Sequence, residues 1–506
     1  MDRVLRSGTS YSAWDGTVYR VKDPSFNFAE LVQRSVEDEH DEWTDDEDND
    51  YDLIEYEYTD DEGDEADLPA PCPSSTSAPA TTPHAGQKYH ANKRSKAVRR
   101  RKRKLAQEAQ DAIDAEPEVR QATRRKHVDG AEPIARPITL DSLPVTRTGY
   151  TAAREPKRGR TLHRTYRLED MVGPNSMWKF DLVKWKGRKT VPFVTMKDEQ
   201  VFMILAGRPE PPEGGAVEAD SYDEDMSSLA DLIEEICPHL SLNTCQRRHR
   251  RGVFPATAHG HAYGGGRKEP MNIAEKPSNA PLFRKLLEHP GMKRLAGFST
   301  GVASGWGPRL VKFYRKYGKA VRSKYPHLKR NFRHGVWAAL TINYGPRTVT
   351  LPHRDFANVP WGWCPITALG NFNPRRGGHL IIWELKLVIE FPAGATIIIP
   401  SSVLTHSNVA VGRGERRYSV TQYTAGGLIR WVDQGFQTKE AFLSQLSKQE
   451  RAREAEKAAG RYREGLAMFS TLAELRALAA GDGSPDDTSD LSDLTDLEDE
   501  DELAAC

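Results

Sequence analysis

Short runs of β-branched and aromatic residues follow one another between about residues 336 and 424. Turn sequences rich in Gly and Pro separate these runs, which are "VWAALTIN", "RTVTL", "HLIIWELKLVIEF", "ATIIIP", "VLTHSNVAV" and "RRYSVTQY". Apolar runs of this length, bounded by turn residues, are typical of β-strands. Many short strands in close succession predict an antiparallel sandwich or jelly roll. We therefore expect an α+β protein with a jelly-roll core and flanking helices.

Helical patterns lie on both sides of this strand-rich segment. Before it, "SNAPLFRKLLEHPG" carries Asn279 as an N-cap, Pro281 in the first turn and Pro290 as a stop. The following segment "GPRLVKFYRKYGKAVRSKYP" has apolar residues at helical spacing, and "SLADLIEEI" predicts a shorter helix upstream. After about Thr438 the chain is rich in Ala, Glu, Lys, Arg and Leu, which favours helix until the segment "GDGSPDD".

The part of the chain upstream of these helices is less regular. The segment "MWKFDLVKWKGRKTVPFVTM" alternates apolar and polar residues around Gly187, which predicts a strand pair in a small accessory element. Residues 208–227 have the composition of a linker or insertion. Residues 1–135 run through acidic, Pro/Ser/Thr/Ala-rich and basic stretches without a sustained apolar period, which is typical of disorder.

These patterns divide the chain into five parts. We expect a disordered tail that is first acidic and then basic, an accessory region with a linker, a folded domain, a helical segment and an acidic disordered tail. Their residues are 1–135, 136–235, 236–436, 437–481 and 482–506, in that order. Only 38% of the residues are hydrophobic and 28% are charged, so much of the length cannot bury a core.

Charge is sorted into blocks, although the formal net charge is zero. Residues 37–67 hold nineteen Asp or Glu, and residues 93–104 hold nine Lys or Arg. Between residues 241 and 436, thirty Lys or Arg stand against eight Asp or Glu. A folded domain this basic indicates a polyanionic partner, most simply DNA and alternatively RNA. The other interpretation is a domain whose charge is offset by the chain's own acidic tails.

Cysteine usage and hydropathy indicate the compartment. The five cysteines are scattered and odd in number, which fits a reducing environment better than a disulfide framework. The sequence has no apolar run of roughly 18 residues and no apolar signal-peptide core at its start, so we expect a soluble, intracellular protein without a membrane partner. The basic run 93–104, followed by Arg124, Arg125 and Lys126, predicts nuclear import or a nucleic-acid patch, and hence a nuclear protein.

A set of polar residues in the strand-rich segment has the pattern of a metal site. His353 and Asp355 are two apart in "LPHRD", and His406 follows about fifty residues later in "SSVLTHSN". Residues two apart on one extended strand point to the same face, so both side chains can reach one ion. Two imidazoles and one carboxylate on one face of iron(II) leave the other positions open. The alternative is a surface His-x-Asp and an unrelated strand histidine.

A second pair of residues suits a carboxylate ligand. Arg417 lies eleven residues after His406, and Ser419 lies two residues further on the same face of the predicted strand. A guanidinium can grip a carboxylate through two parallel hydrogen bonds, and a hydroxyl can add a third. Arg416 is expected to point the other way.

These residues together resemble a known family. His353-x-Asp355, the Gly377-Gly378 turn, His406 and Arg417-x-Ser419 resemble the 2-oxoglutarate/iron(II) dioxygenases with a double-stranded β-helix, over about residues 336–424. The sequence "HRDFAN" is similar to the signature of the TET/JBP group, which oxidises the methyl of modified pyrimidines in DNA. Residues 250–436 are similar to the compact fungal members of that group.

The resemblance implies a role for each residue. Domain 236–436 is then the dioxygenase domain, Fe(II) is held by the two histidines and the aspartate, and 2-oxoglutarate is held by Arg417 and Ser419. Asn343, in "LTINYG", is similar to an asparagine that helps to hold 2-oxoglutarate in AlkB-like relatives, although the spacing differs. Asn358 of the signature and Tyr423, six residues after Arg417, match the positions that contact and stack on a flipped base.

Two departures from the TET pattern limit these assignments. Five scattered cysteines cannot supply the zinc-bound region of the animal proteins, so the basic segments 247–251 and 309–333 are the candidates for supporting DNA. The histidine expected two residues after the stacking tyrosine is Ala425 here, which leaves the choice of base open.

The sequence therefore predicts a dioxygenase that hydroxylates the methyl group of a modified nucleobase, most simply 5-methylcytosine in DNA. One alternative keeps the iron site but demethylates another base, such as N6-methyladenine or a base in RNA, or hydroxylates a protein. The other alternative is a non-catalytic DNA-binding module on the same fold. The intact ligand set counts against that last possibility.

Overall fold

The computed structural model describes residues 3–4, 10–11, 121–154, 164–209 and 221–480. The chain divides into two compact units, residues 1–50 and residues 51–506. In the first, β1 (Arg3–Val4) pairs antiparallel with β2 (Ser10–Tyr11). The acidic segment 37–67, the basic run 93–104 and the acidic tail 482–506 lie outside the described residues.

The second unit is built on a nine-stranded sheet. From one edge to the other, the sheet consists of β3 (Ile134–Arg136), β5 (Val191–Thr195), β6 (Val201–Gly207), β13 (Thr396–Ile399), β10 (Cys364–Asn371), β15 (Arg416–Tyr423), β9 (Ala339–Asn343), β7 (Ala256–Ala262) and β8 (Met271–Asn272). Neighbouring strands are antiparallel, except for the parallel pair β3 and β5. The strand ladder therefore joins chain segments more than 200 residues apart.

A smaller sheet shares the core of the large one. It contains β14 (His406–Asn408), β11 (Leu380–Ile382), β12 (Leu387–Ile389) and β4 (Asp181–Val183), in that order. Alternate residues such as Ile366 and Ala368 of β10, and Leu380 and Ile382 of β11, pack into one buried cluster. The expected mixture of helices with a large antiparallel sheet is confirmed, and the two sheets are compatible with a jelly-roll core, whose closure stays a prediction.

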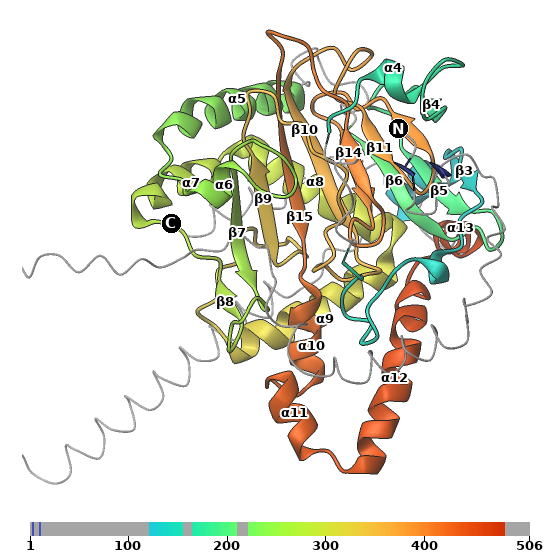
Figure 1. The fold of residues 1–506 in the computed structure, drawn as a ribbon, viewed down its shortest axis with the longest axis vertical. Helices are drawn as coiled ribbons and strands as arrows, with labels where there is room; N and C mark the ends of the chain where they lie inside the picture. Colours follow the sequence, from blue (N-terminus) through green and yellow to red (C-terminus); the bar gives the residue numbers. More distant parts are fainter. Residues whose placement is uncertain (1–2, 5–9, 12–120, 155–163, 210–220, 481–506) are drawn as a thin grey trace, which may run out of the picture. The chain divides into compact units, whose positions relative to one another are not determined.

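Helices pack on the outer face of the large sheet. A second buried cluster joins α5 (Ser221–Ile236), α7 (Ala280–Leu287) and α8 (Pro290–Trp306) to the outward side chains of β9 and β15 (Figure 1). The remaining described helices are α3 (Gln121–Asp129), α4 (Leu168–Met171), α6 (Thr244–Arg247), α9 (Pro308–Lys324), α10 (Gly426–Asp433), α11 (Lys439–Gln445), α12 (Lys448–Leu466), α13 (Leu472–Ala480) and the short 3₁₀ turns η1 (Leu140–Ser142), η4 (Cys237–His239) and η5 (Pro277–Asn279). None of the helices in the described ranges combines the length and the apolarity needed to cross a bilayer.

The helix between Pro290 and Trp306 was not expected from the sequence. Pro290 is not the stop of a preceding helix but the first residue of α8, where a proline costs nothing because its missing N–H has no intrahelical partner. The ring Nδ1 of His289 accepts a hydrogen bond from Gly291 N and caps the helix. Nearly every residue of α8 is buried, so the sequence lacks the alternation of faces that marks an exposed helix.

Asn279 precedes α7 as predicted, but its side chain does not cap the helix. Its carboxamide instead accepts from Ser241 N (2.9 Å) and donates to Ser241 O (3.0 Å). The amide therefore ties α7 to the segment that leads into α6.

The region before residue 236 is part of the main fold, which corrects the expected accessory element. The two strands flanking Gly187 do not pair with each other: β4 joins the small sheet beside β12, and β5 joins the large sheet beside β6. Helix α3 and the first two residues of β3 fall within residues 1–135, so the folded part begins earlier than the predicted boundary. Helix α5 likewise begins at Ser221, inside the expected linker.

Replacing Phe202 tests whether this region is integral to the core. Phe202 of β6 is fully buried, and its carbonyl accepts a hydrogen bond from Trp363 Nε1 (2.9 Å). We expect Phe202→Ala to lower the free energy of unfolding of the main transition by about 3–5 kcal/mol, because it leaves a cavity between packed strands. Denaturant unfolding followed by tryptophan fluorescence measures this.

The control is Met196→Ala, in the turn between β5 and β6, where the side chain is 65% exposed. Its effect should stay within about 0.5 kcal/mol. If Phe202→Ala leaves the free energy of unfolding of the main transition unchanged, residues 191–207 unfold as a separate element.

Candidate metal and carboxylate site

The segment between Pro346 and His353 connects the two sheets. At one end Arg417 N of β15 donates to Pro346 O (2.7 Å), and Thr348 N donates to Arg417 O (3.0 Å). At the other end Asn408 N of β14 donates to Thr350 O (3.2 Å). The predicted strand "RTVTL" is therefore a bridge between sheets and not a member of either ladder.

The bridge ends where His353 meets His406, the first residue of β14. The two residues exchange backbone hydrogen bonds of 3.1 and 2.9 Å, as an antiparallel pair. Their imidazole rings lie 4.3 Å apart between centroids. The backbone pairing thus places two histidines that are fifty-three residues apart in sequence side by side.

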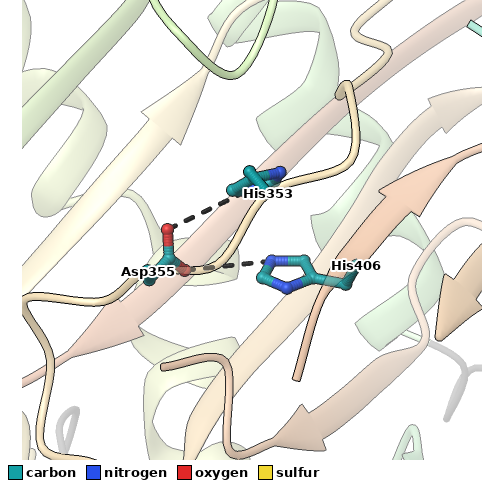
Figure 2. A group of neighbouring side chains, drawn as sticks. All are labelled: His353, Asp355 and His406. Carbon is teal, nitrogen blue, oxygen red and sulfur yellow. Dashed lines mark ion pairs between the residues drawn. The ribbon is translucent and has the colours of Figure 1, made fainter. Parts of the chain in front are cut away.

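Asp355 completes a three-residue cluster (Figure 2). Its Oδ1 lies 3.8 Å from His353 Nε2, and its Oδ2 lies 3.8 Å from His406 Nε2. The three ligand atoms fall within 4.8 Å of one another, and no other cluster of metal-ligating side chains occurs in the described ranges. The predicted ligand set is brought together by the fold.

The way in which Asp355 reaches the cluster differs from the prediction. His353 and Asp355 do not share one face of a continuous strand, because the strand pairing stops at His353. Asp355 lies in the following loop, where its backbone N donates to Ser401 O (2.9 Å). The loop, anchored to the turn before β14, turns the carboxylate back towards the two rings.

Backbone carbonyls orient both imidazoles. His353 Nδ1 donates to Leu351 O (2.7 Å), and His406 Nδ1 donates to Leu404 O (3.0 Å). Placing the proton on Nδ1 leaves the lone pair on Nε2, the atom that faces Asp355 in both residues. Such outer hydrogen bonds are the usual way in which proteins fix the tautomer and orientation of a metal-binding histidine.

The protonation states suit a metal. Burial, with the neighbouring His406, holds the pKa of His353 well below its ordinary value, so the ring is neutral. Burial raises the pKa of Asp355, but His353, His406 and the arginines at positions 250 and 251 outweigh it and lower the pKa to about 2. A neutral imidazole at His353 beside an ionised carboxylate at Asp355 suits the binding of a divalent cation, which requires deprotonated ligands. This donor set suits iron(II) and related divalent ions, so the residues fit the predicted metal.

Arg417 is a buried cation with no ion-pair partner among the described residues. Its side chain is 1% exposed and lies between the rings of Phe372 and Phe391, about 6.0 and 5.9 Å from their centroids. One terminal nitrogen donates to Thr348 O (3.2 Å), while Nε has no hydrogen-bond partner. No carboxylate of the described residues forms an ion pair with it, and burial alone lowers its pKa to about 10. Because an uncompensated buried charge costs several kcal/mol, the site calls for an anionic ligand.

Ser419 and Asn343 lie beside this guanidinium. Ser419 is two residues from Arg417 on β15, hence on the same face, and stands opposite Asn343 of β9 in register. Asn343 Nδ2 donates to Ser419 Oγ (3.0 Å), and its buried Oδ1 has no hydrogen-bond partner. Arg416 points to the opposite face, as predicted, and there it pairs with Glu234 of α5, a contact that the sequence did not predict. The fold thus assembles a polar pocket from the three predicted carboxylate-binding residues.

The segment between Pro346 and His353 also joins the metal cluster to Arg417 and its neighbours. Arg417 donates to Thr348 O, and Thr348 precedes His353 by only five residues. Five residues of extended chain span at most about 17 Å. A short stretch of backbone therefore links the metal cluster to Arg417.

The two predicted base-contacting residues, Asn358 and Tyr423, are both buried and both lie near Cys364. Asn358 Nδ2 donates to Cys364 Sγ (3.5 Å), and Tyr423 packs in one cluster with Cys364. The hydroxyl of Tyr423 accepts from Thr341 Oγ1 (3.5 Å). The other hydrophobic members of that cluster are mostly alanines.

Two residues near the cluster were not predicted individually. Arg250 donates to Arg354 O (2.8 Å), lies 3.7 Å from Asp355 Oδ1 and stacks over the ring of Phe356. The sequence signal was only a basic cluster, "RRHRRG", which does not single out one arginine. Cys364 begins β10, a strand that the sequence analysis missed.

Comparisons with known proteins add limited information. No protein-family model matches the chain, and no curated protein matches it. Among solved structures, NgTET1 in complex with 5mC DNA aligns over 49% of this chain and 83% of that chain, with 9% identity and a TM-score of 0.32. An oxidoreductase of the 2OG-Fe(II) oxygenase family from Burkholderia pseudomallei aligns over 43% and 93%, with 14% identity and a TM-score of 0.23. Neither likeness is close enough to assign a function, which has to come from the residues.

Metal titration tests the three-residue cluster. We expect one Mn²⁺ or Co²⁺ to bind per chain, measured by calorimetry without oxygen chemistry. Replacing His353 or His406 by Ala should weaken binding more than about 100-fold, beyond the 10–100-fold cost of losing an outer hydrogen-bond partner. The control, His327→Ala, removes an exposed histidine and should change nothing. Equal affinity in all four proteins would exclude the site.

Proposed function

We propose that this chain is an iron(II)- and 2-oxoglutarate-dependent dioxygenase that hydroxylates the methyl group of a modified nucleobase, with 5-methylcytosine in DNA as the first candidate. One observation carries the proposal. A two-histidine, one-carboxylate cluster shares a connecting segment with a buried arginine that has no anionic partner among the described residues. A metal that binds a co-substrate carrying a second, distal carboxylate satisfies both features at once.

Each part of the site has a separate task. When bound, iron(II) with 2-oxoglutarate and dioxygen supplies the oxidation of a C–H bond, with one oxygen atom going to the substrate and the other to succinate. His353, Asp355 and His406 hold the metal, and the Leu351 and Leu404 carbonyls keep the two rings oriented. His353, Asp355 and His406 act as metal ligands and take no proton from the substrate.

The carboxylate pocket binds and orients the co-substrate. Arg417 offers a fixed fork of N–H groups, and Ser419 adds a hydroxyl next to it. Phe372 and Phe391 exclude water from the guanidinium, so an ion pair formed there is strong and is not screened by salt. The remaining face of the metal cluster is left for the substrate.

A nucleobase is the proposed substrate for two reasons. Residues 241–436 carry a large excess of Lys and Arg, which favours a polyanion over a neutral metabolite. Asn358 and Tyr423 offer an amide and an aromatic ring, the groups used to recognise a base that has left its duplex. The basic run 93–104 supports, in the same proposal, a nuclear location.

The decisive experiment is turnover with defined oligonucleotides. Full-length protein with Fe(II), 2-oxoglutarate and ascorbate should convert 5-methylcytosine in duplex DNA to 5-hydroxymethylcytosine, with succinate formed in proportion. Mass spectrometry of the nucleosides measures the product, and Asp355→Ala is the inactive control. Oligonucleotides with N6-methyladenine, and RNA, run in parallel. If only N6-methyladenine or RNA gives a product, the chain is an oxygenase but 5-methylcytosine is not its substrate. If no substrate gives succinate, the chain is not a 2-oxoglutarate-dependent oxygenase.

Arg417 and Arg416 form a matched pair for testing the co-substrate pocket. Arg417→Met should weaken 2-oxoglutarate binding to the Mn²⁺-loaded protein about 10- to 100-fold, because hydrogen bonds to a charged group contribute roughly 1.5–3 kcal/mol. The ligand-free variant should unfold no more easily than the original protein, since it loses an uncompensated buried charge.

Arg416→Met removes the neighbouring guanidinium, which faces α5 and pairs with Glu234. It should leave 2-oxoglutarate binding unchanged, as measured by the same calorimetry. If both variants lose the co-substrate equally, or neither does, Arg417 is not its ligand.

A further inference from the structure

Helix α9 carries a row of exposed lysines. The helix has seven Lys or Arg in its 17 residues and no Asp or Glu. Lys312, Lys316 and Lys319 are exposed, while residues such as Leu310 and Tyr314 bury the opposite face. At 100° per residue the three lysines fall within an arc of about 60°, so they lie on one side of the helix. We call these three residues the lysine row.

Two lysines of the row have no ion-pair partner in the part of the chain that the structure describes. Arg309, one turn before the row, pairs with Glu474 of α13. Lys312 and Lys316, by contrast, form no ion pair with any carboxylate in the ranges that the structure describes; Lys316 lies over the ring of Tyr317. Arg309, near the N-terminal end of the helix, is thus neutralised, whereas Lys312 and Lys316 beyond it have no such counter-charge among the described residues.

Such a row reduces the stability of the helix. Like charges at i and i+4, as in Lys312–Lys316, cost about 0.2–0.5 kcal/mol for each pair. Packing does not require cations at exposed positions, since Gln has nearly the same helix propensity as Lys. The exposed lysines are therefore accessible to an anionic partner.

The cationic surface continues along the chain after α9. Residues 309–334 contain ten Lys or Arg and no acidic residue. Lys329 and Arg333 of this stretch line a cavity of about 380 Å³ together with Arg284 and Lys293. Glu275 and Glu288 also line this cavity, and Glu275 pairs with Lys329, so its excess charge is smaller than that of the helix.

We propose that the lysine row is a docking surface for the sugar-phosphate backbone of a nucleic-acid duplex. The choice of partner rests on the proposed function, and the surface itself lies outside the metal and carboxylate site. A duplex carries one negative charge for about every 1.7 Å of its axis, in a continuous line. Arg309 to Lys319 covers about 15 Å of helix, a length over which a straight row of cations meets several phosphates.

Salt dependence measures this contact directly. We compare the full chain with the triple variant Lys312→Gln, Lys316→Gln, Lys319→Gln in binding to a labelled duplex, by anisotropy at several salt concentrations. Each lost phosphate contact lowers the slope of log K against log [salt] by about 0.9, so the slope should fall by about 2–3. The affinity should fall similarly for methylated and unmethylated duplexes, since backbone contacts do not distinguish bases.

Helix α12 provides the matched control. Lys448, Arg453 and Lys457 are exposed there, and replacing all three by Gln makes the same change in net charge. This control variant should keep the original slope. An equal loss in both variants would show that only net charge matters, and would overturn a located surface.

Two further outcomes are informative. If the lysine-row variant binds duplex more tightly than the original chain, the row serves an acidic segment of the protein itself, such as residues 37–67, and the proposal is wrong. Binding is measured without turnover, so failure of the proposed function is seen separately. If the protein is inactive but the triple variant lowers the salt slope as expected, the docking surface is supported and the proposed function is not. If the protein is active but the triple variant leaves the slope unchanged, the docking surface is wrong.

Discussion

The arrangement of the site depends on one pair of backbone hydrogen bonds, between His353 and His406. They join the end of a connecting segment to the first residue of β14, at the point where the two sheets come together. Because both rings project from this single antiparallel pair, their separation is set by backbone geometry and not by flexible side chains. Asp355 only has to turn back from the next loop, which its own bond to Ser401 O arranges.

The second constraint is the buried guanidinium of Arg417. Most buried arginines are paired with a carboxylate, because the desolvation of a lone cation is costly. Here the aromatic rings of Phe372 and Phe391 and one backbone carbonyl are its described neighbours. The free protein therefore holds unfavourable electrostatic energy that a carboxylate ligand relieves. Binding specificity follows, since a neutral molecule of the same shape leaves that cost in place.

Sequence patterns predicted the chemistry better than the connections between elements. The His353, Asp355 and His406 set and the Arg417-x-Ser419 pair were expected from residue spacing and from the family resemblance, and Asn343 was expected from the resemblance alone. Elements buried on all sides were missed: α8 has no polar face, and β10 begins with the sequence "CPITALGN", in which apolar and small residues mix without alternation. Pairing partners were also missed, because the assignment of β4 and β5 to different sheets depends on segments some 200 residues away.

The residues proposed for substrate recognition differ from the metal ligands in how far the sequence marks them. Metal binding and carboxylate binding each require particular residue types, so the metal cluster and Arg417 can be recognised in the sequence. The hydrophobic neighbours of Tyr423 are mostly small side chains, which form no motif. Asn358 is held there through Cys364, a residue that neither resembles a signature nor stands out in composition. Tyr423 and Ala425 meet the rest of this cluster only because the fold brings distant segments together, so no sequence motif marks it. We propose separate surfaces for two tasks: the cations of α9 for affinity to a polyanion, and the residues around Tyr423 for the choice of a base.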